Sequence, residues 1–223
     1  MSLATDLCLN PNDYFTDEVL WACVGKDVLD VGSNEGGMAE GYLGNGCRVC
    51  HLFEPSPRLL ELSRQRLSGY SNVVYNQVGV SDTYGRLRDV EFAESWVLRP
   101  KGEMPELRVS PGALKFQPES FDVDLVPLDG YANATDVGLV KIDVEGYEFR
   151  VLRGAESLLK QYKPLVVLEL SFYVGKIGDS ISEFIDYLLE LGTLRDVHGK
   201  LIDADRLVSQ FPHHTSCDIL IEL

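Results

Sequence analysis

A glycine-rich turn follows a short apolar run near residue 30, with an acidic residue just before it. The turn and its flanks hold, in order, Asp30, Gly32, Ser33, Asn34 and Gly36. A glycine directly after a buried strand permits a tight turn, and a second glycine lets a ligand approach the backbone where a helix begins. The spacing differs from the Gly-x-Gly-x-x-Gly of dinucleotide sites, and the carboxylate of Asp30 repels pyrophosphate. We therefore expect a ligand that is cationic or carries hydroxyl groups.

Glu54 provides the second half of this expected binding site. It lies at the end of the next apolar run, 22 residues after Gly32. An acid at that distance from the glycine turn accepts hydrogen bonds from both ribose hydroxyls. Asp30, the glycines and Glu54 therefore predict a site for a ribonucleoside that has no pyrophosphate and carries a positive charge.

Three further acids follow two later apolar runs. Asp143 ends the run at 138–143, Glu145 begins the turn after it, and Glu169 nearly ends the run at 164–170. Open α/β sheets bind ligands at the carboxyl ends of their strands, so these acids are the candidate catalytic residues. We expect all three side chains to lie near a bound ligand. The alternative is that these acids cap the next helix or pair with basic side chains nearby.

The sequence leaves the presence of a metal open. Asp143, Glu169 and a histidine would suit a divalent cation, but their spacing does not show that they meet. His213 and His214 precede the final strand, and they either reach the mouth of the site or lie in a surface loop. His51 lies within a strand and is expected to be a core residue.

Strands and helices alternate along the chain and would position these residues. Apolar runs predict strands at 28–31, 48–53, 72–80, 138–143 and 164–170, and helical patterns cover 38–43, 57–67, 147–162 and 180–191. Ser56 is expected to cap the second of these helices, with Pro57 at its first position. This alternation is typical of a doubly wound, mostly parallel α/β sheet. The final runs, 192–197 and 217–223, have no helical pattern between them and are expected to form an antiparallel pair.

Residues 84–127 interrupt this alternation. They hold five of the ten prolines, and the pattern of 119–127 predicts an antiparallel strand paired with residues 85–93. Long loops in compact domains are often functional. We therefore expect an insertion that covers one end of the sheet, near the acceptor site.

The length of the chain fits one domain over residues 1–223. An N-terminal helical segment is expected within residues 1–25. Its aromatic residues Tyr14 and Phe15 either meet a positively charged ligand by cation–π contact or belong to a helix that simply packs on the core.

Taken together, these acids and glycines resemble a known group of enzymes. The residues around Asp30, Gly32 and Glu54 are similar to the cofactor site of class I S-adenosylmethionine (SAM) methyltransferases. The run that begins at Lys141, Lys-Ile-Asp-Val-Glu-Gly, resembles the FkbM family of these enzymes and is the specific part of the match. Asp129 matches the Leu-Asp that precedes this run in the family. The resemblance covers residues 26–170.

One feature of the sequence departs from the family pattern. The residue before the second glycine is usually apolar in the family, whereas here Glu35 precedes Gly36 and Gly37. The departure concerns the detail of the cofactor loop rather than the class.

The resemblance implies a Rossmann-like class I methyltransferase with a seven-stranded, mostly parallel sheet and an antiparallel C-terminal strand. It implies SAM as the cofactor and S-adenosylhomocysteine (SAH) as its product. Ser81 occupies the position at which this class contacts the adenine. The implied cofactor-binding residues are Asp30, Gly32, Ser33, Asn34, Gly36, Glu54, Ser81 and Asp143. The implied catalytic residues are Asp143, as a general base or a metal ligand, Glu145, which would position cofactor or acceptor, and Glu169, as a second contact to the acceptor. The implied reaction transfers a methyl group to a hydroxyl of a sugar, a glycan or a related small natural product.

Charge and composition exclude some functions. The chain has 35 acidic and 20 basic residues, a formal net charge of −15, and such a field repels nucleic acids. No apolar stretch is long enough to span a bilayer, and the N-terminus has no signal-peptide pattern. Five cysteines suggest reduced thiols in a cytoplasmic setting. Cys47 and Cys50, which have C-x-x-C spacing, are expected to be buried in a strand, and a redox or metal role is the alternative.

Two other functions compete with methyl transfer. The first is a Rossmann-type oxidoreductase that uses NAD; the missing third glycine and Asp30 argue against it. The second is a SAM-binding module without catalytic activity. The presence of Asp30, Glu54, Asp143 and Glu145 argues against this second alternative.

Overall fold

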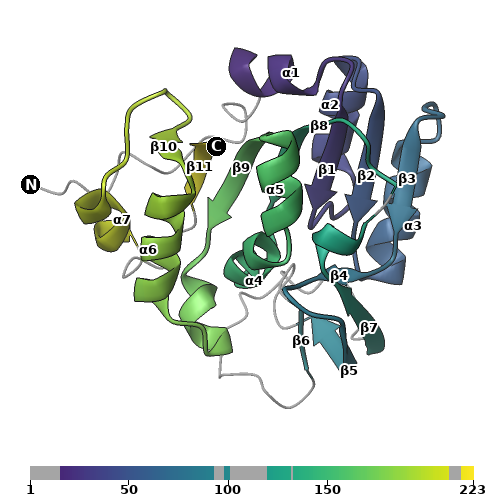
Figure 1. Cartoon of the computed structure of the whole chain (residues 1–223). Helices are drawn as coiled ribbons and strands as arrows, with labels where there is room; N and C mark the ends of the chain where they lie inside the picture. The colour runs from purple at the N-terminus through teal and green to yellow at the C-terminus, as the bar shows by residue number, and fades with distance from the viewer. Residues whose placement is uncertain (1–15, 93–97, 101–119, 132, 211–216) are drawn as a thin grey trace, which may run out of the picture.

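A seven-stranded sheet forms the centre of the molecule (Figure 1). The computed structural model describes residues 16–92, 98–100, 120–131, 133–210 and 217–223. The strand order is β10-β11-β9-β8-β1-β2-β3; β11 runs antiparallel to β10 and β9 on its two sides, and the other neighbouring strands pair in parallel. The strands are β1 (Asp27–Val31), β2 (Val49–Phe53), β3 (Val73–Asn76), β8 (Val137–Ile142), β9 (Leu165–Leu170), β10 (Thr193–Asp196) and β11 (Cys217–Glu222). This confirms the predicted α/β sheet with an antiparallel C-terminal strand.

Helices cover both faces of the sheet because successive residues of a strand point to opposite faces. Val28 of β1 packs in a core with α1, α2 and the residue after α3, whereas Leu29 and Val31 pack in a second core with α4, α5 and α6. Figure 1 shows α4 and α5 in front of the sheet. The helices are α1 (Asp17–Cys23), α2 (Gly37–Gly44), α3 (Pro57–Arg66), α4 (Glu148–Arg153), α5 (Glu156–Tyr162), α6 (Ile181–Leu191) and α7 (Ala204–Gln210). Two 3-10 helices are η3 (Leu128–Gly130) and η4 (Phe172–Ile177).

A second, four-stranded sheet lies beside the carboxyl ends of the central strands (Figure 1). Its order is β4-β7-β5-β6, and its strands are β4 (Gly79–Val80), β5 (Gly85–Phe92), β6 (Leu98–Pro100) and β7 (Phe121–Val126). β5 and β7 are antiparallel, which confirms the pairing predicted from the alternating pattern.

The single strand predicted at 72–80 was wrong in its extent. β3 belongs to the central sheet, whereas β4 pairs in parallel with β7 in the second sheet. β7 approaches Gly79 so closely that a Cβ atom there would lie 2.8 Å from a methyl carbon of Leu125. The division therefore depends on a tertiary contact that the local pattern does not encode.

The helix predicted at 147–162 is also divided. A Cβ atom on Gly154 would lie 2.1 Å from the carbonyl oxygen of Ser81, so the chain at this point is pressed against another segment. A second helix, α5, begins after this break. Its first turn is stabilised because the carboxylate of Asp129 accepts hydrogen bonds from the backbone N–H groups of Ser157 (3.0 Å) and Leu158 (2.9 Å). Asp129, matched to the family by its sequence position, thus acts here as a helix cap.

The end of the chain confirms one prediction and corrects another. β10 and β11 form the expected antiparallel pair. However, α7 lies between them, where no helix was predicted. It has only seven residues, and Leu207 is its deeply buried side chain, so it is too short to give a periodic pattern.

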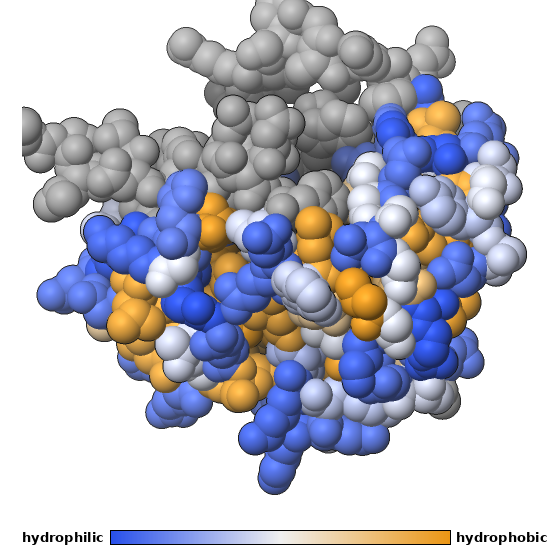
Figure 2. All heavy atoms as spheres, turned by 90° about the horizontal axis from the view of Figure 1, so that it is seen from above, coloured by the Kyte–Doolittle hydropathy of each residue, from blue (hydrophilic) through white to orange (hydrophobic). Residues whose placement is uncertain are grey.

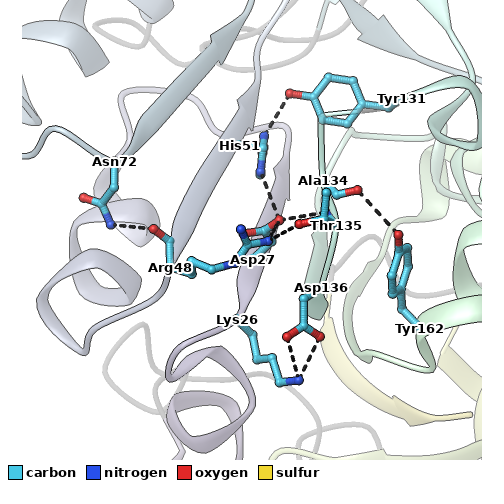
Figure 3. Close-up of polar contacts among 10 residues, drawn as sticks. All are labelled: Lys26, Asp27, Arg48, His51, Asn72, Tyr131, Ala134, Thr135, Asp136 and Tyr162. Carbon is cyan, nitrogen blue, oxygen red and sulfur yellow. Dashed lines mark hydrogen bonds and ion pairs between the residues drawn. The ribbon is translucent and has the colours of Figure 1, made fainter.

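A polar network joins β1 and β2 near their amino ends (Figure 3). It includes Asp27, the first residue of β1, whereas the glycine turn follows the last residue of that strand. The side chain of His51 is 1% exposed; its Nδ1 lies 2.9 Å from the hydroxyl of Tyr131 and its Nε2 3.6 Å from a carboxylate oxygen of Asp27. Asp27 also accepts hydrogen bonds from Arg48 (2.5 Å) and from the backbone N–H of Thr135 (3.0 Å). Burial lowers the pKa of His51, although Asp27 opposes this effect. The prediction that His51 is a core residue is confirmed.

The surface at this end of the molecule is mixed in character. Figure 2 shows mainly hydrophilic residues with hydrophobic ones exposed between them.

Cys47 and Cys50 are buried, as predicted, and both are free thiols. Within the described part of the chain, no helix combines the length and the apolar character needed to cross a membrane.

Candidate active site

A cavity of about 340 Å³ opens at the carboxyl ends of β1, β2, β8 and β9. Its wall contains both acidic and apolar side chains. The acidic side chains are Glu54, Asp143, Glu145 and Glu169. The apolar wall includes Leu87, Val90, Val123 and Leu125, all from β5 and β7. The insertion therefore contributes to the same cavity as the acids at the strand ends.

The glycine turn after β1 forms part of the cavity wall and requires glycine at its first position. Gly32 has a φ of +77°, and a Cβ atom there would lie 1.8 Å from the carbonyl oxygen of Asp143. Asn34 also lines the cavity and has a φ of +51°. Gly36, with a φ of +75°, precedes the first residue of α2. Ser33 is buried and does not line the cavity, and among the described residues its hydroxyl makes no hydrogen bond.

Glu54 presents a buried carboxyl group to the cavity. Its side chain accepts hydrogen bonds from the backbone N–H groups of Ser56 (2.8 Å) and Asn34 (3.0 Å). Burial raises the pKa of Glu54 to about 7, although these two hydrogen bonds lower it. Near neutral pH this group can therefore either accept a hydrogen bond as a carboxylate or donate one as an acid. The predicted cap of α3 next to it is confirmed, because Ser56 Oγ accepts from Leu59 N (3.3 Å).

Lys141 contacts the glycine turn and Asp143 and does not itself line the cavity. Its Nζ donates to the carbonyl oxygen of Gly32 (2.8 Å) and forms ion pairs with Asp143 (3.1 Å) and Asp30 (3.5 Å). Burial lowers the pKa of Lys141, but the two carboxylates raise it more, so that the pKa lies above its ordinary value. The lysine is therefore a buried cation that connects two strands and the glycine turn.

Asp30 does not occupy the place expected from the sequence. Its side chain is fully buried, it is absent from the cavity lining, and β1 continues to Val31. Across the sheet Asp30 is the partner of Lys141, and because neighbouring side chains in register share a face, its carboxylate meets the lysine instead of a ligand. The structure thus places the Asp30 carboxylate beside Lys141, and its contact with a ligand stays a prediction.

The three acids at the ends of β8 and β9 do come together. One carboxylate oxygen from each of Asp143, Glu145 and Glu169 lies within 4.8 Å of the others. Hard divalent cations favour such oxygen ligands, so these residues could hold one. Within the described ranges no histidine joins them, and His213 and His214 lie outside the described residues, as do Tyr14 and Phe15.

A buried glutamate supports the turn that carries Glu145. Glu145 has a φ of +53° and Gly146 a φ of +116°, so the backbone is constrained at two successive residues. Both carboxylate oxygens of Glu148 accept from the N–H of Gly146 at 2.9 Å. Burial raises the pKa of Glu148 to about 8, against the lowering effect of this hydrogen bond.

Ser81 does not reach the cavity. It is 2% exposed, and its hydroxyl donates to the carboxylate of Asp82 (3.3 Å). Gly79 and Val80, the two residues directly before Ser81, line the cavity instead. The hydroxyl of Ser81 therefore faces Asp82, and its contact with an adenine stays a prediction.

Sequence reasoning missed the roles of Lys141 and Glu148. The signal for the first was a lysine inside an otherwise apolar strand, Gly-Leu-Val-Lys-Ile, where only a paired charge is tolerated. The signal for the second was an acid five residues after Asp143, at the start of a helix. Neither residue could be assigned a partner without the register of β1 and β8 or the shape of the turn.

The strand order, the glycine turn and the acid after β2 define a Rossmann-like class I methyltransferase fold. The model of the methyltransferase FkbM domain matches residues 30–194, and the chain belongs to this family. No curated protein matches the sequence.

Two solved structures are similar to this chain, and the first of them supports the fold. SMU.1697c from Streptococcus mutans, solved with SAH, is 10% identical, with a TM-score of 0.53 over 97% of this chain and 99% of that one. Methyltransferase FkbM from Methylobacillus flagellatus KT is 16% identical, with a TM-score of 0.49 over 88% of this chain. The match covers 43% of the Methylobacillus protein, so the chain spans less than half of its length.

Proposed function

We propose that this chain is a SAM-dependent O-methyltransferase that acts on a hydroxyl of a sugar, a glycan or a related small natural product. The observation that carries the proposal is a single cavity whose wall contains the glycine turn, Glu54 and the three acids at the ends of β8 and β9. Membership of the FkbM family supports methyl transfer, and the geometry of the acids supports a hydroxyl acceptor.

The residues in the cavity fit an adenosyl group. The missing side chain at Gly32 leaves the backbone of the turn open to a ligand, and Asn34 lies beside it in the wall. Glu54 would bind the ribose hydroxyls, since its carboxyl group lies in the cavity at the end of β2. Asp143 would face the positively charged part of the ligand. No phosphate-binding residue is needed for such a ligand.

When bound, SAM supplies a methyl group on a positively charged sulfur. The chain's own residues then hold the acceptor and move one proton. Asp143, whose side chain is 38% exposed, would accept the proton of the acceptor hydroxyl. Glu145 and Glu169 would hold neighbouring hydroxyls of the acceptor. Positioning of this kind can supply about 7–11 kcal/mol of the barrier.

The proposed acceptor is small and not a nucleic acid. The net charge of −15 and the acidic cavity wall disfavour a polyanion. The apolar wall from β5 and β7 favours an acceptor that also has a carbon-rich face. The four described cysteines are buried free thiols, which supports the cytoplasmic setting that we propose.

A methyl-transfer screen against sugars, glycans and small phenols, scored by mass gain, tests the proposal. We expect transfer to at least one hydroxyl compound and, in calorimetry, binding of SAM and SAH but not of NAD. Binding of NAD alone would favour the oxidoreductase. Binding of SAH without transfer to any acceptor of the panel would favour a silent binding module.

A further inference from the structure

We propose that Lys141 is a positioning residue of this site, which holds the Asp143 carboxylate at the cavity and ties it to the glycine turn. Asp30 serves as its buried counter-charge. The inference rests on the proposed function in one respect, namely that Asp143 accepts the proton of the acceptor. Lys141 itself does not line the cavity and acts through its neighbours.

The contacts of Lys141 account for a buried cation. Its side chain is only 3% exposed, and an unpaired ammonium group at such a position is strongly unfavourable. A lysine has three N–H donors, and three acceptors surround this one at 2.8 to 3.5 Å: the oxygens of Gly32, Asp143 and Asp30. Asp30 and Gly32 lie at the end of β1, whereas Asp143 follows Lys141 at the end of β8, so the ammonium group joins the carboxyl ends of these two strands.

The three acceptors differ in how else they are held. The glycine turn has backbone support, because Gly32 N donates to Phe53 O (2.9 Å) and Asp143 N donates to Val31 O (3.0 Å). The carboxylate of Asp143 is half-exposed, and in the described part of the chain its ion pair with Lys141 is the contact that orients it. Loss of Lys141 should therefore disturb the Asp143 side chain more than the turn.

The ion pair with Lys141 explains the buried position of Asp30 without a bound ligand. It is completely buried, and among the described residues neither of its oxygens makes a hydrogen bond. Its ion pair with Lys141 balances one charge within the sheet, since the two residues are cross-strand partners. Removing the lysine alone would leave Asp30 as a buried, unpaired charge and could prevent folding.

The test therefore uses two variants on one background. The first carries Asp30→Asn, which keeps the Lys141–Asp143 pair. The second carries Asp30→Asn and Lys141→Met, which removes both charges of the buried Asp30–Lys141 pair and leaves the half-exposed Asp143 without its partner. Lys26→Met is the matched control, because Lys26 is half-exposed and pairs with Asp136 at the amino end of the sheet, 2.8 Å away.

The turnover number kcat and the dissociation constant of SAH, measured together, separate a positioning role of Lys141 from general structural support. We expect kcat of the double variant to fall about 100-fold below that of Asp30→Asn, as for a base displaced by about 1 Å. The dissociation constant of SAH should change by less than about threefold. An equal kcat in the two variants, or a loss of SAH affinity in the same proportion as kcat, would overturn the proposal. Lys26→Met should leave both constants unchanged.

A measurement without turnover distinguishes this inference from the proposed function. In crystal structures of the two variants without ligand, we expect the Asp143 carboxylate to leave its place beside residue 141 in the double variant only. The same position in both variants would refute the role of Lys141. A wild-type protein that methylates no acceptor would refute the proposed function, and the crystallographic comparison would still decide the positioning role.

Discussion

Gly32 and Asp143 approach so closely that any side chain at position 32 would collide with the backbone of the acid. A Cβ atom on Gly32 would lie 1.8 Å from the carbonyl oxygen of Asp143, and the φ of +77° is one that other residues rarely adopt. The ends of β1 and β8 are thus in direct backbone contact where the cavity opens.

Gly32→Ala should therefore destabilise the fold and abolish SAH binding. The strained φ alone costs about 1–3 kcal/mol, and the collision adds to it. Gly37→Ala is the control, because a Cβ atom there meets nothing within 4 Å at the first residue of α2. That control should raise the free energy of unfolding by about 0.4–1 kcal/mol. Urea unfolding and calorimetry measure both effects, and equal stabilities of the two variants would contradict the geometry.

Glu54→Gln should weaken SAH binding. The amide keeps the size of the side chain but brings N–H donors where the carboxylate accepts from Asn34 N and Ser56 N. Loss of a charge-assisted hydrogen bond of about 1.5–3 kcal/mol corresponds to roughly 10- to 100-fold in the dissociation constant. Glu61→Gln, an exposed change on α3, serves as the control in the same calorimetric titration. An unchanged affinity would remove Glu54 from the binding site.

Stability should fall as the pH rises because of Glu148. Burial raises its pKa from 4.5 to about 8, so between these values the folded chain keeps a proton that the unfolded chain has lost. The free energy of unfolding then decreases with rising pH over this window, and Glu54 adds to the decrease up to about 7.

Glu148→Gln isolates this contribution, because the amide oxygen can still accept from Gly146 N. Measured by urea unfolding, the stability of the variant relative to wild type should increase steadily from about pH 4.5 to about pH 8. Other groups, including His51, cancel in this difference. A difference that is constant with pH would mean that Glu148 titrates normally in the folded protein.

Methyl transfer should persist in EDTA. Asp143 already pairs with Lys141 at 3.1 Å, so a cation among the three carboxylates would have to compete with a buried ammonium group. We expect the rate in EDTA to stay within about twofold of the untreated rate, since the base needs no Lewis acid. A loss of activity that Mg²⁺ or Mn²⁺ restores would contradict this account and assign the cluster to a metal.

Much of the fold was predictable because burial leaves a local pattern. β1 and β8 are short runs of mainly apolar, buried residues, and the Ser-Pro start of α3 is a strong cap signal. The breaks at Gly79 and Gly154 were not predictable, since each depends on a segment distant in sequence that presses against the glycine. A seven-residue helix such as α7 is too short to show its period.

The site was predictable in composition but not in arrangement. The sequence placed Glu54, Asp143, Glu145 and Glu169 at strand ends, and the structure brings all four to one cavity. Asp30 and Ser81 also lie near strand ends, yet both side chains are buried away from the cavity. The face of the sheet to which a side chain points depends on the register and twist of its strand. A shift of one residue in the register turns that side chain to the opposite face.

A crystal structure of the chain with SAH tests the central claim most directly. The account predicts the adenosyl group in the cavity at the carboxyl ends of β1 and β2, with the ribose hydroxyls within hydrogen-bond distance of Glu54 and the sulfur facing Asp143. A nucleoside bound elsewhere on the molecule, or an Asp143 side chain turned away from the sulfur, would contradict it.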